Sequence, residues 1–186
     1  MYEPREDSFL IAKHIKDFCH KSSDFNVLDM GTGSGILAIE ASRYSDDVTA
    51  VDIDKQVILY LKGKKEDPTL SYLSNKARTI KFIHSDLFSN LKGKRFNLII
   101  FNPPYLPSKS NAYKHIDLDG GLHGTEIIEK FLKQAKKHLK PHGKILLLAS
   151  SLNRGILLLF RKYDFSYKIL DQENFFFEKL YVFILE

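Results

Sequence analysis

Short apolar runs alternate with helical patterns along this chain, and this alternation limits the folds open to it. The first five runs span residues 26–30, 48–53, 79–85, 96–102 and 144–150. Strands that alternate with helices form a mostly parallel sheet with helices on both faces. Two later runs, "FSYKIL" and "KLYVFIL", lie close together and predict an antiparallel pair. We therefore expect an α/β fold with a seven-stranded, mostly parallel sheet.

Helical patterns fill the spaces between these runs. Residues 125–139 carry one apolar face at helical spacing, and "KPHG" beyond them predicts the end of that helix. A second helix is expected from Ile36 to Tyr44, and a third is expected to begin near Asp54. With strands and helices throughout, the sequence predicts one domain over residues 1–186.

Composition excludes several classes of protein. The chain is 44% hydrophobic and 27% charged, as ordinary globular domains are. No apolar run approaches the ~20 residues that span a bilayer, and the start lacks the features of a secretory signal, so we expect a cytoplasmic protein without a membrane partner. Cys19 is the one cysteine, which excludes an internal disulfide, and the seven histidines lack metal-ligand spacing, so no metal is predicted.

Polar side chains stand at the ends of four predicted strands. Asp29, Asp52, Asp86 and Asn102 each lie at or just after the apolar run of their strand. In parallel sheets ligands bind beyond the carboxyl ends of the strands. The four residues therefore predict one site at that edge of the sheet.

The loop "LDMGTGSG" has a glycine at every second position, at Gly31, Gly33 and Gly35. Its spacing is neither the G-x-G-x-x-G of dinucleotide-binding loops nor that of a phosphate-binding P-loop. Asp52 could accept hydrogen bonds from both hydroxyls of a ribose, and Asp86 one from an adenine amino group. Alone, the glycines could form a tight turn and each acid could cap a helix, but three acids at successive strand ends favour a nucleoside-sized cofactor.

These motifs together are similar to class I S-adenosylmethionine-dependent methyltransferases. The matching parts are D-x-G-x-G-x-G, the acid that ends the second strand, S-D-L-F and N-P-P-Y. The resemblance implies a Rossmann-like sandwich with an antiparallel last strand and S-adenosyl-L-methionine as cofactor. A loop with acidic rather than basic side chains suits this cofactor, which carries a sulfonium and an ammonium and no phosphate.

The N-P-P-Y segment suits methylation of a planar NH2 group. The side-chain oxygen of Asn102 and the carbonyl of Pro103 could accept its two hydrogens, while Pro103 and Pro104 fix the backbone. Tyr105 offers a flat surface for stacking. Catalysis would then come from positioning and preorganised polar groups. The alternative is a tight proline turn in which Asn102 satisfies its own backbone.

A narrower resemblance covers nearly the whole chain. "YEPREDSFLI", "NPPYLP" and "DGGLHGTEIIEKFL" resemble the short archaeal and eukaryotic branch of the HemK-type glutamine methyltransferases. That branch methylates the glutamine of the Gly-Gly-Gln motif in class 1 translation release factors. By this resemblance the acceptor is a protein glutamine. The catalytic segment is then Asn102, Pro103, Pro104 and Tyr105, and the cofactor contacts are Ser8, Asp29, Gly31, Gly33, Gly35, Asp52, Ile53, Asp86, Leu87 and Asn102.

The same resemblance extends to two further segments. Arg5, Glu6 and Asp7 become additional candidate cofactor contacts, although Asp7 or Ser8 could equally be the N-cap of the first helix. A loop near the substrate would contain Gly120, Gly121 and Gly124, with His123 as an ordinary loop residue.

The family also implies a partner, a small zinc-binding activator protein that pairs with the sheet edge near the third strand. A longer segment here, "KGKKEDPTLSYLSNKA", lies beside that edge and bears on this pairing.

Two other function classes stay open. An adenine-N6 methyltransferase acting on RNA or DNA shares N-P-P-Y, and the net charge of +5 is compatible with a nucleic acid. We rank it second, because the catalytic fold fills the chain and leaves no separate domain for base readout. A non-catalytic scaffold protein would have lost motif residues, and none is lost.

Overall fold

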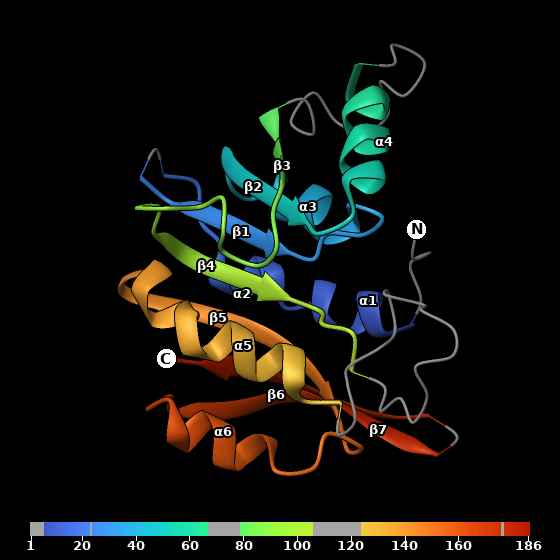
Figure 1. The fold of residues 1–186 in the computed structure, drawn as a ribbon, viewed down its shortest axis with the longest axis vertical. Coiled ribbons are helices and arrows are strands. Elements are labelled where there is room, and N and C mark those ends of the chain that lie inside the picture. The colour runs from blue at the N-terminus through green and yellow to red at the C-terminus, as the bar shows by residue number, and fades with distance from the viewer. Residues whose placement is uncertain (1–5, 23, 67–78, 106–123, 176) are drawn as a thin grey trace.

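The computed structural model describes residues 6–22, 24–66, 79–105, 124–175 and 177–186. They form one sheet with helices on both faces (Figure 1). The strands are β1 (Asn26–Met30), β2 (Asp47–Asp52), β3 (Lys81–His84), β4 (Phe96–Phe101), β5 (Leu139–Ser150), β6 (Tyr167–Phe175) and β7 (Glu178–Leu185). The helices are α1 (Glu6–Ala12), α2 (Ile15–Phe18), α3 (Ile36–Ala41), α4 (Lys55–Glu66), α5 (Glu126–Ala135) and α6 (Ile156–Lys162), with a 3-10 turn, η3, at Lys136–His138.

The sheet has the strand order β3-β2-β1-β4-β5-β7-β6. Strands β1 to β5 pair in parallel, and β7 runs antiparallel to both of its neighbours, β5 and β6. The prediction of seven strands, mostly parallel, with an antiparallel last strand is confirmed. The carboxyl ends of β1, β2 and β4 consequently lie side by side.

Alternate residues of each strand point to opposite faces and enter two separate apolar clusters. In β4, Leu98 and Ile100 pack in the cluster that α1, α3 and α4 cover, whereas Ile99 and Phe101 pack in the cluster under α5 and α6. Because both faces are buried, β4 is apolar from Leu98 to Phe101, as the run "LIIF" predicted.

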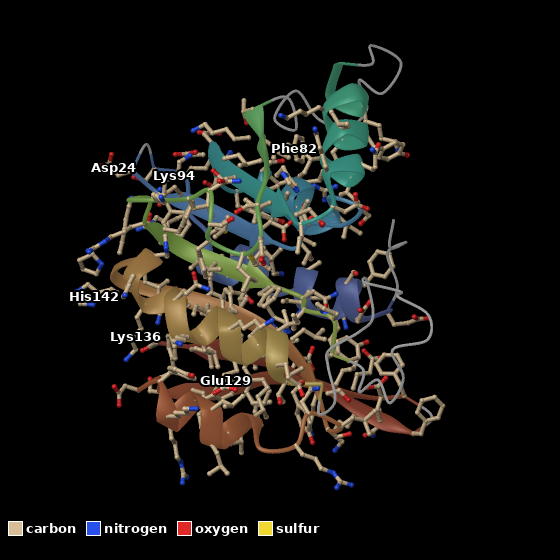
Figure 2. The ribbon with its side chains drawn as sticks, in the orientation of Figure 1. Asp24, Phe82, Lys94, Glu129, Lys136 and His142 are labelled. Carbon is tan, nitrogen blue, oxygen red and sulfur yellow. The ribbon has the colours of Figure 1, made fainter. Side chains whose placement is uncertain are left out.

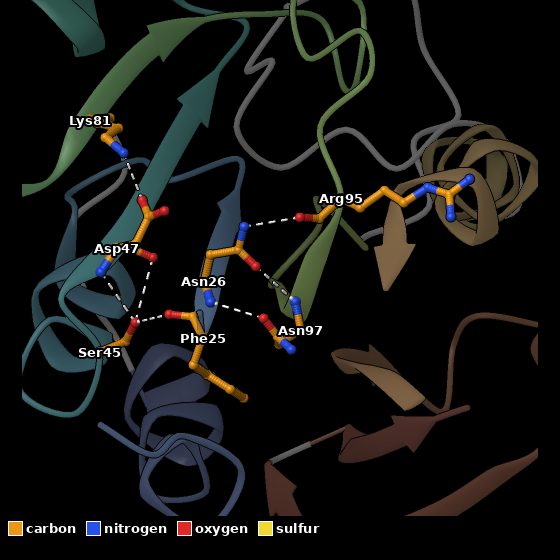
Figure 3. A network of polar contacts seen from close by, with 7 residues as sticks. All are labelled: Phe25, Asn26, Ser45, Asp47, Lys81, Arg95 and Asn97. Carbon is orange, nitrogen blue, oxygen red and sulfur yellow. Dashed lines mark hydrogen bonds and ion pairs between the residues drawn. The ribbon is translucent and has the colours of Figure 1, made fainter. Parts of the chain in front are cut away.

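A polar network ties the amino ends of the strands together (Figure 3). The backbone N–H of Asn26 donates to Asn97 Oδ1 at 3.0 Å, and the N–H of Asn97 donates to Asn26 Oδ1 at 3.2 Å. Asn26 Nδ2 also donates to the carbonyl of Arg95, and Lys81 Nζ pairs with Asp47 Oδ1 at 2.8 Å. At this amino edge the polar side chains form hydrogen bonds and ion pairs with one another and with the backbone. The polar groups that a ligand could bind are therefore those of the opposite, carboxyl edge.

The predicted helix 125–139 is confirmed to within a residue at each end, although its last turn is a 3-10 turn: α5 ends at Ala135 and η3 continues to His138. The predicted start of the fifth strand at residue 144 is wrong, because β5 begins at Leu139, which pairs with Phe96 before a register shift. The "KPHG" residues therefore form an irregular first part of β5. Gly143 is required there, because a Cβ at this position would lie 2.8 Å from the carbonyl oxygen of Phe96.

Other boundaries differ by a few residues. The second helix ends at Ala41 rather than Tyr44, β3 is shorter than its run, and β6 extends to Phe175. Helix α1 begins at Glu6, which places Asp7 and Ser8 inside its first turn, so the prediction that either is the N-cap is wrong.

Two observations limit what the described part of the chain can be. None of its helices combines the length and apolar character needed to cross a membrane, and none of its His, Cys, Asp and Glu side chains gather in a group of three that could hold a metal ion. Cys19 is half-buried after α2, and its burial raises the thiol pKa to about 12. At neutral pH it is therefore a protonated, unreactive thiol.

Candidate active site

The carboxyl edge of the sheet brings together the polar residues that the sequence placed at strand ends. Met30 pairs with Val51 on one side and with Phe101 on the other. Asp29 is therefore close to Asp52, the last residue of β2, and to Asn102, which follows β4. The structure therefore brings Asp29, Asp52 and Asn102 to one edge of the sheet.

Asp29 is fully buried at the end of β1. Its Oδ2 accepts hydrogen bonds from Thr32 Oγ1 at 2.6 Å and from the N–H of Ala38 at 3.0 Å, whereas its Oδ1 has no partner among the described residues. Burial raises the pKa of Asp29 to about 7, the charge of Asp52 adds to the rise, and the bonds from Thr32 and Ala38 oppose it. A buried carboxylate in this state is stabilised by a cation placed nearby.

The glycine loop turns tightly between β1 and α3. Gly31, Gly33 and Gly35 have φ values of 66°, 51° and 83°, a region that residues with a Cβ rarely adopt. The N–H of Gly33 donates to Asp52 Oδ2 at 2.9 Å, and the N–H of Asp54 donates to Asp52 Oδ1 at 2.8 Å. The Asp52 carboxylate is thus held in one orientation.

The residues that directly follow β2 and β3 include both apolar and acidic side chains. Ile53 is 52% exposed directly after Asp52, an unusual place for a large apolar side chain next to an acid. Asp86 is exposed, and Leu87 is half-buried with a φ of 45°. The N–H of Ser85 donates to the carbonyl of Asp52 at 2.8 Å, which fixes this turn against β2. The apolar side chain of Ile53 suits the flat face of a base, and the acidic side chain of Asp86 suits its amino group.

Asn102 contacts a residue from the far end of the chain. Its Nδ2 donates to Asp7 Oδ2 at 3.1 Å, and its Oδ1 is buried with no partner among the described residues. Pro103 is buried, while Pro104 and Tyr105 are half-buried. Ser8 is buried beside Asp7 in the first turn of α1. The start of α1 therefore lies against the Asn102 side chain.

Asn153 is a site residue that the sequence prediction missed. Its Nδ2 donates to the carbonyls of Tyr105 and Gly124, both at 2.7 Å, and its Oδ1 accepts the N–H of Ser150 at 2.7 Å. Both N–H donors of this buried amide are used, and its oxygen accepts one hydrogen bond. Asn153 follows the fifth apolar run, so the rule that found the other strand-end residues would have found it too.

The remaining candidates lie outside the described residues. These are Arg5, Gly120, Gly121 and His123. Gly124 is described and buried, with a φ of 70°.

Two regions thus make up the candidate site. The cofactor region comprises Asp29, residues 31–35, Asp52, Ile53, Asp86 and Leu87, and the acceptor region comprises Asp7, Ser8, residues 102–105 and Asn153.

Comparison with known proteins identifies the family. The sequence pattern of the methyltransferase small domain matches residues 7–175. The chain belongs to this methyltransferase family. The "Putative protein N5-glutamine methyltransferase MJ0928" of Methanocaldococcus jannaschii is 37% identical over 157 residues, which cover 82% of this chain and 73% of that protein. The HemK-type resemblance is confirmed.

Two further matches place the methyltransferase among its relatives. The ribosomal protein uL3 glutamine methyltransferase of Bradyrhizobium diazoefficiens is 32% identical over 68% of this chain, which spans 41% of that longer protein. The solved E. cuniculi Mtq2-Trm112 complex, described as responsible for methylation of the termination factor eRF1, matches with a TM-score of 0.75 and 21% identity, covering 100% of this chain and 97% of that one. This likeness shows the shared Rossmann-like fold.

The residues of the cofactor region fit S-adenosylmethionine, the methyl donor of this methyltransferase. Residues 31–35 contain no lysine or arginine, so nothing there is arranged for a phosphate. The unpartnered Asp29 Oδ1 lies in a buried, acidic environment that a cationic group would satisfy. Asp52 is oriented for a ribose and Ile53 exposes an apolar surface for adenine. All of these residues come from β1, β2 and β3.

Proposed function

We propose that this chain transfers a methyl group from S-adenosylmethionine to the side-chain nitrogen of a protein glutamine, in the Gly-Gly-Gln motif of a class 1 translation release factor. The observation that carries this proposal is the Asn102 amide, whose Oδ1 is buried with no partner in the described part of the chain while its Nδ2 is already bound. A buried acceptor without a donor is costly, so a donor is expected to come from the substrate. The NH2 group of a glutamine supplies it.

The residues have distinct roles in this proposal. S-adenosylmethionine, when bound, supplies a methyl group on a positively charged sulfur. Asn102 Oδ1 and the carbonyl of Pro103 accept the two hydrogens of the substrate NH2, which orients its nitrogen toward the methyl group and limits lone-pair delocalisation into the amide. Tyr105 provides a surface against which the amide plane packs. Because the nitrogen releases a proton only as it gains the methyl, no strong base is required of the chain.

The cofactor region holds the donor in this proposal. Asp29 and the glycine loop surround the methionine part, and Asp52 binds the ribose. Ile53, Asp86 and the backbone of Leu87 contact the adenine, with Ser8 near the reacting end.

Three basic side chains lie away from the candidate site. Lys94 precedes β4, Lys136 follows α5, and His142 lies in the first part of β5. Figure 2 shows all three at the amino edge of the sheet, away from the carboxyl edge that carries Asn102. A protein acceptor is supported by the relatives, two of which are named as protein glutamine methyltransferases.

A label-transfer assay tests the proposal. The purified protein and methyl-labelled cofactor would be offered the release factor, the same factor with its Gly-Gly-Gln glutamine changed to asparagine, the ribosomal protein uL3, and bulk RNA. Label on the unchanged factor alone supports the proposal. Label on uL3 keeps glutamine chemistry and changes the substrate, whereas label on RNA would replace the proposal with the adenine-N6 alternative.

A small zinc-binding activator protein is the partner we propose. Strand β3 is one of the two edge strands of the described sheet, and an added strand could pair with its outer edge. The fold match to Mtq2, solved together with Trm112, supports such a partner. We also propose that the protein acts in the cytoplasm, where it would meet the release factor. Higher activity after co-expression with a candidate activator, and loss of that gain when β3 residues are substituted, would test the pairing.

A further inference from the structure

We propose that Asp7 is a positioning residue for methyl transfer, and that it fixes which end of the Asn102 amide faces the substrate. The inference rests on the proposed function, because it assigns the orientation of the acceptor that receives the substrate NH2. The sequence had placed Asp7 among the candidate cofactor contacts, and the structure places its carboxylate 3.1 Å from Asn102 Nδ2.

The hydrogen-bonding groups of Asp7 and Asn102 allow only one orientation of the Asn102 amide. An ionised carboxylate only accepts hydrogen bonds, so the end of the Asn102 amide that faces Asp7 must be its NH2 group. The Oδ1 of Asn102 then points away from Asp7. That oxygen is buried and without a partner among the described residues, which makes it the acceptor available to a substrate.

Asp7 is itself held in place. Its Oδ1 accepts the backbone N–H of Ser8 at 2.7 Å and lies 3.3 Å from Ser8 Oγ, which leaves Oδ2 directed at Asn102. The side chain is 4% exposed. Helix α1 is anchored through Leu10 and Ile11, both buried in the apolar cluster on this face of the sheet. Asp7, in the first turn of α1, can therefore fix the orientation of the Asn102 amide, which follows β4.

Without the Asp7 carboxylate the Asn102 amide would lose this fixed orientation. An asparagine side chain has nearly the same shape after a 180° rotation, so sterics alone distinguish its two ends poorly. The rotated amide would present NH2 to the NH2 of the substrate, and two donors would face each other. Asp7 prevents this arrangement without touching the reacting atoms.

The variant Asp7→Asn tests the inference with little change in shape. Its amide oxygen can still accept the N–H of Ser8, and its NH2 then faces Asn102 and drives the Asn102 amide to rotate. We expect kcat for glutamine methylation to fall on the order of 10²-fold, as when one preorganised polar group is lost, with the Kd for cofactor unchanged. The matched control is Asp17→Asn, which removes the same charge from the 55% exposed side chain of Asp17 on α2 and should leave kcat unchanged.

A second measurement does not depend on activity. In the 15N NMR spectrum the side-chain NH2 signals of Asn102 are assigned by their disappearance in Asn102→Ala. These signals should move in Asp7→Asn and stay in place in Asp17→Asn, because only the first variant changes the group that accepts from Nδ2.

The outcomes separate the inference from the proposed function. A fall in kcat with unchanged cofactor affinity and shifted Asn102 signals supports it. Weaker cofactor binding in proportion to the lost rate would make Asp7 a cofactor contact instead, and an unchanged rate with unchanged signals would overturn the inference. If the wild-type protein transfers no methyl to glutamine but the Asn102 signals still move, the proposed function fails while the orienting role of Asp7 stands.

Discussion

The cofactor region and the acceptor region share one edge of the sheet but are assembled differently. In the cofactor region the polar contacts are local, since Asp29 binds Thr32 and Ala38, 3 and 9 positions away, and Asp52 binds Gly33, 19 positions away. In the acceptor region Asn102 binds Asp7 across 95 positions, and Asn153 binds Tyr105 across 48. One region is a continuous strand–loop–helix–strand unit, and the other is made from separate parts of the chain.

The difference also separates the two tasks of a methyltransferase. A cofactor that is the same in every reaction can be held by one local unit. The acceptor must be recognised by its shape and its donors, and here that surface combines α1, the end of β4 and the turn after β5. We therefore expect substitutions in the two regions to change different quantities, and the following predictions, from largest to smallest effect, test this separation.

Loss of the acceptor oxygen should have the largest effect. Asn102→Ala removes the oxygen that we propose accepts the substrate NH2, so we expect kcat to fall by about 10²–10³-fold. The Kd for cofactor, measured by calorimetry, should change little. If cofactor binding were lost with the rate, Asn102 would belong to the cofactor region and the separation would fail.

Substitution of Asp52 should show the opposite pattern. Asp52→Asn removes a charged acceptor from the ribose, so we expect the Kd for cofactor to rise by about 10- to 100-fold, the equivalent of about 1.5–3 kcal/mol, with kcat at saturating cofactor nearly unchanged. The control is Asp47→Asn at the other end of β2, where Asp47 pairs with exposed Lys81. Equal effects of the two variants would contradict a specific role for Asp52.

Substitution of Asn153 should mainly lower the stability of the protein. Asn153→Asp keeps an acceptor for the N–H of Ser150 but removes the two donors to the carbonyls of Tyr105 and Gly124 and places a carboxylate oxygen against them. We expect the free energy of unfolding, from urea titration, to fall by roughly 2 kcal/mol, with a higher KM for the protein substrate and unchanged cofactor affinity. A variant as stable as the wild type would show that these bonds are dispensable.

The raised pKa of Asp29 gives the last prediction, a dependence of stability on pH. The pKa is about 7 in the folded protein and 3.8 otherwise, so between these values the folded state binds the proton that the unfolded state has released. Its contribution to stability is complete below about pH 4 and is lost as pH rises through 7.

The variant Asp29→Asn isolates this contribution, because its amide does not titrate. The difference in unfolding free energy between the variant and the wild type should rise in favour of the variant from pH 5 to pH 7 and then level off. A difference independent of pH would mean that Asp29 stays charged when buried. Cofactor binding to the wild type should strengthen over the same range, since its cationic groups favour the ionised carboxylate.

Much of the fold could be predicted because it follows from local patterns. Buried parallel strands must be apolar on both faces, so the runs at 26–30 and 96–102 mark β1 and β4 within a residue. The error at the start of the fifth strand has a long-range cause. Strand β5 begins at Leu139 rather than at Lys144, and Leu139 pairs with Phe96, a residue far away in sequence that no local periodicity can reveal.

The amino-acid sequence by itself determined the cofactor region, since its residues lie within one continuous segment and their spacing reflects strand ends, positive φ angles and a charged ligand. The sequence determined only part of the acceptor region. The sequence indicated Asn102 as an acceptor, but which end of its amide faces the substrate depends on Asp7, and the position of Tyr105 depends on Asn153. Only the tertiary structure decided these contacts, because a hydrogen bond between distant segments requires the sheet and its helices to bring them within about 3 Å, and no local pattern records that approach.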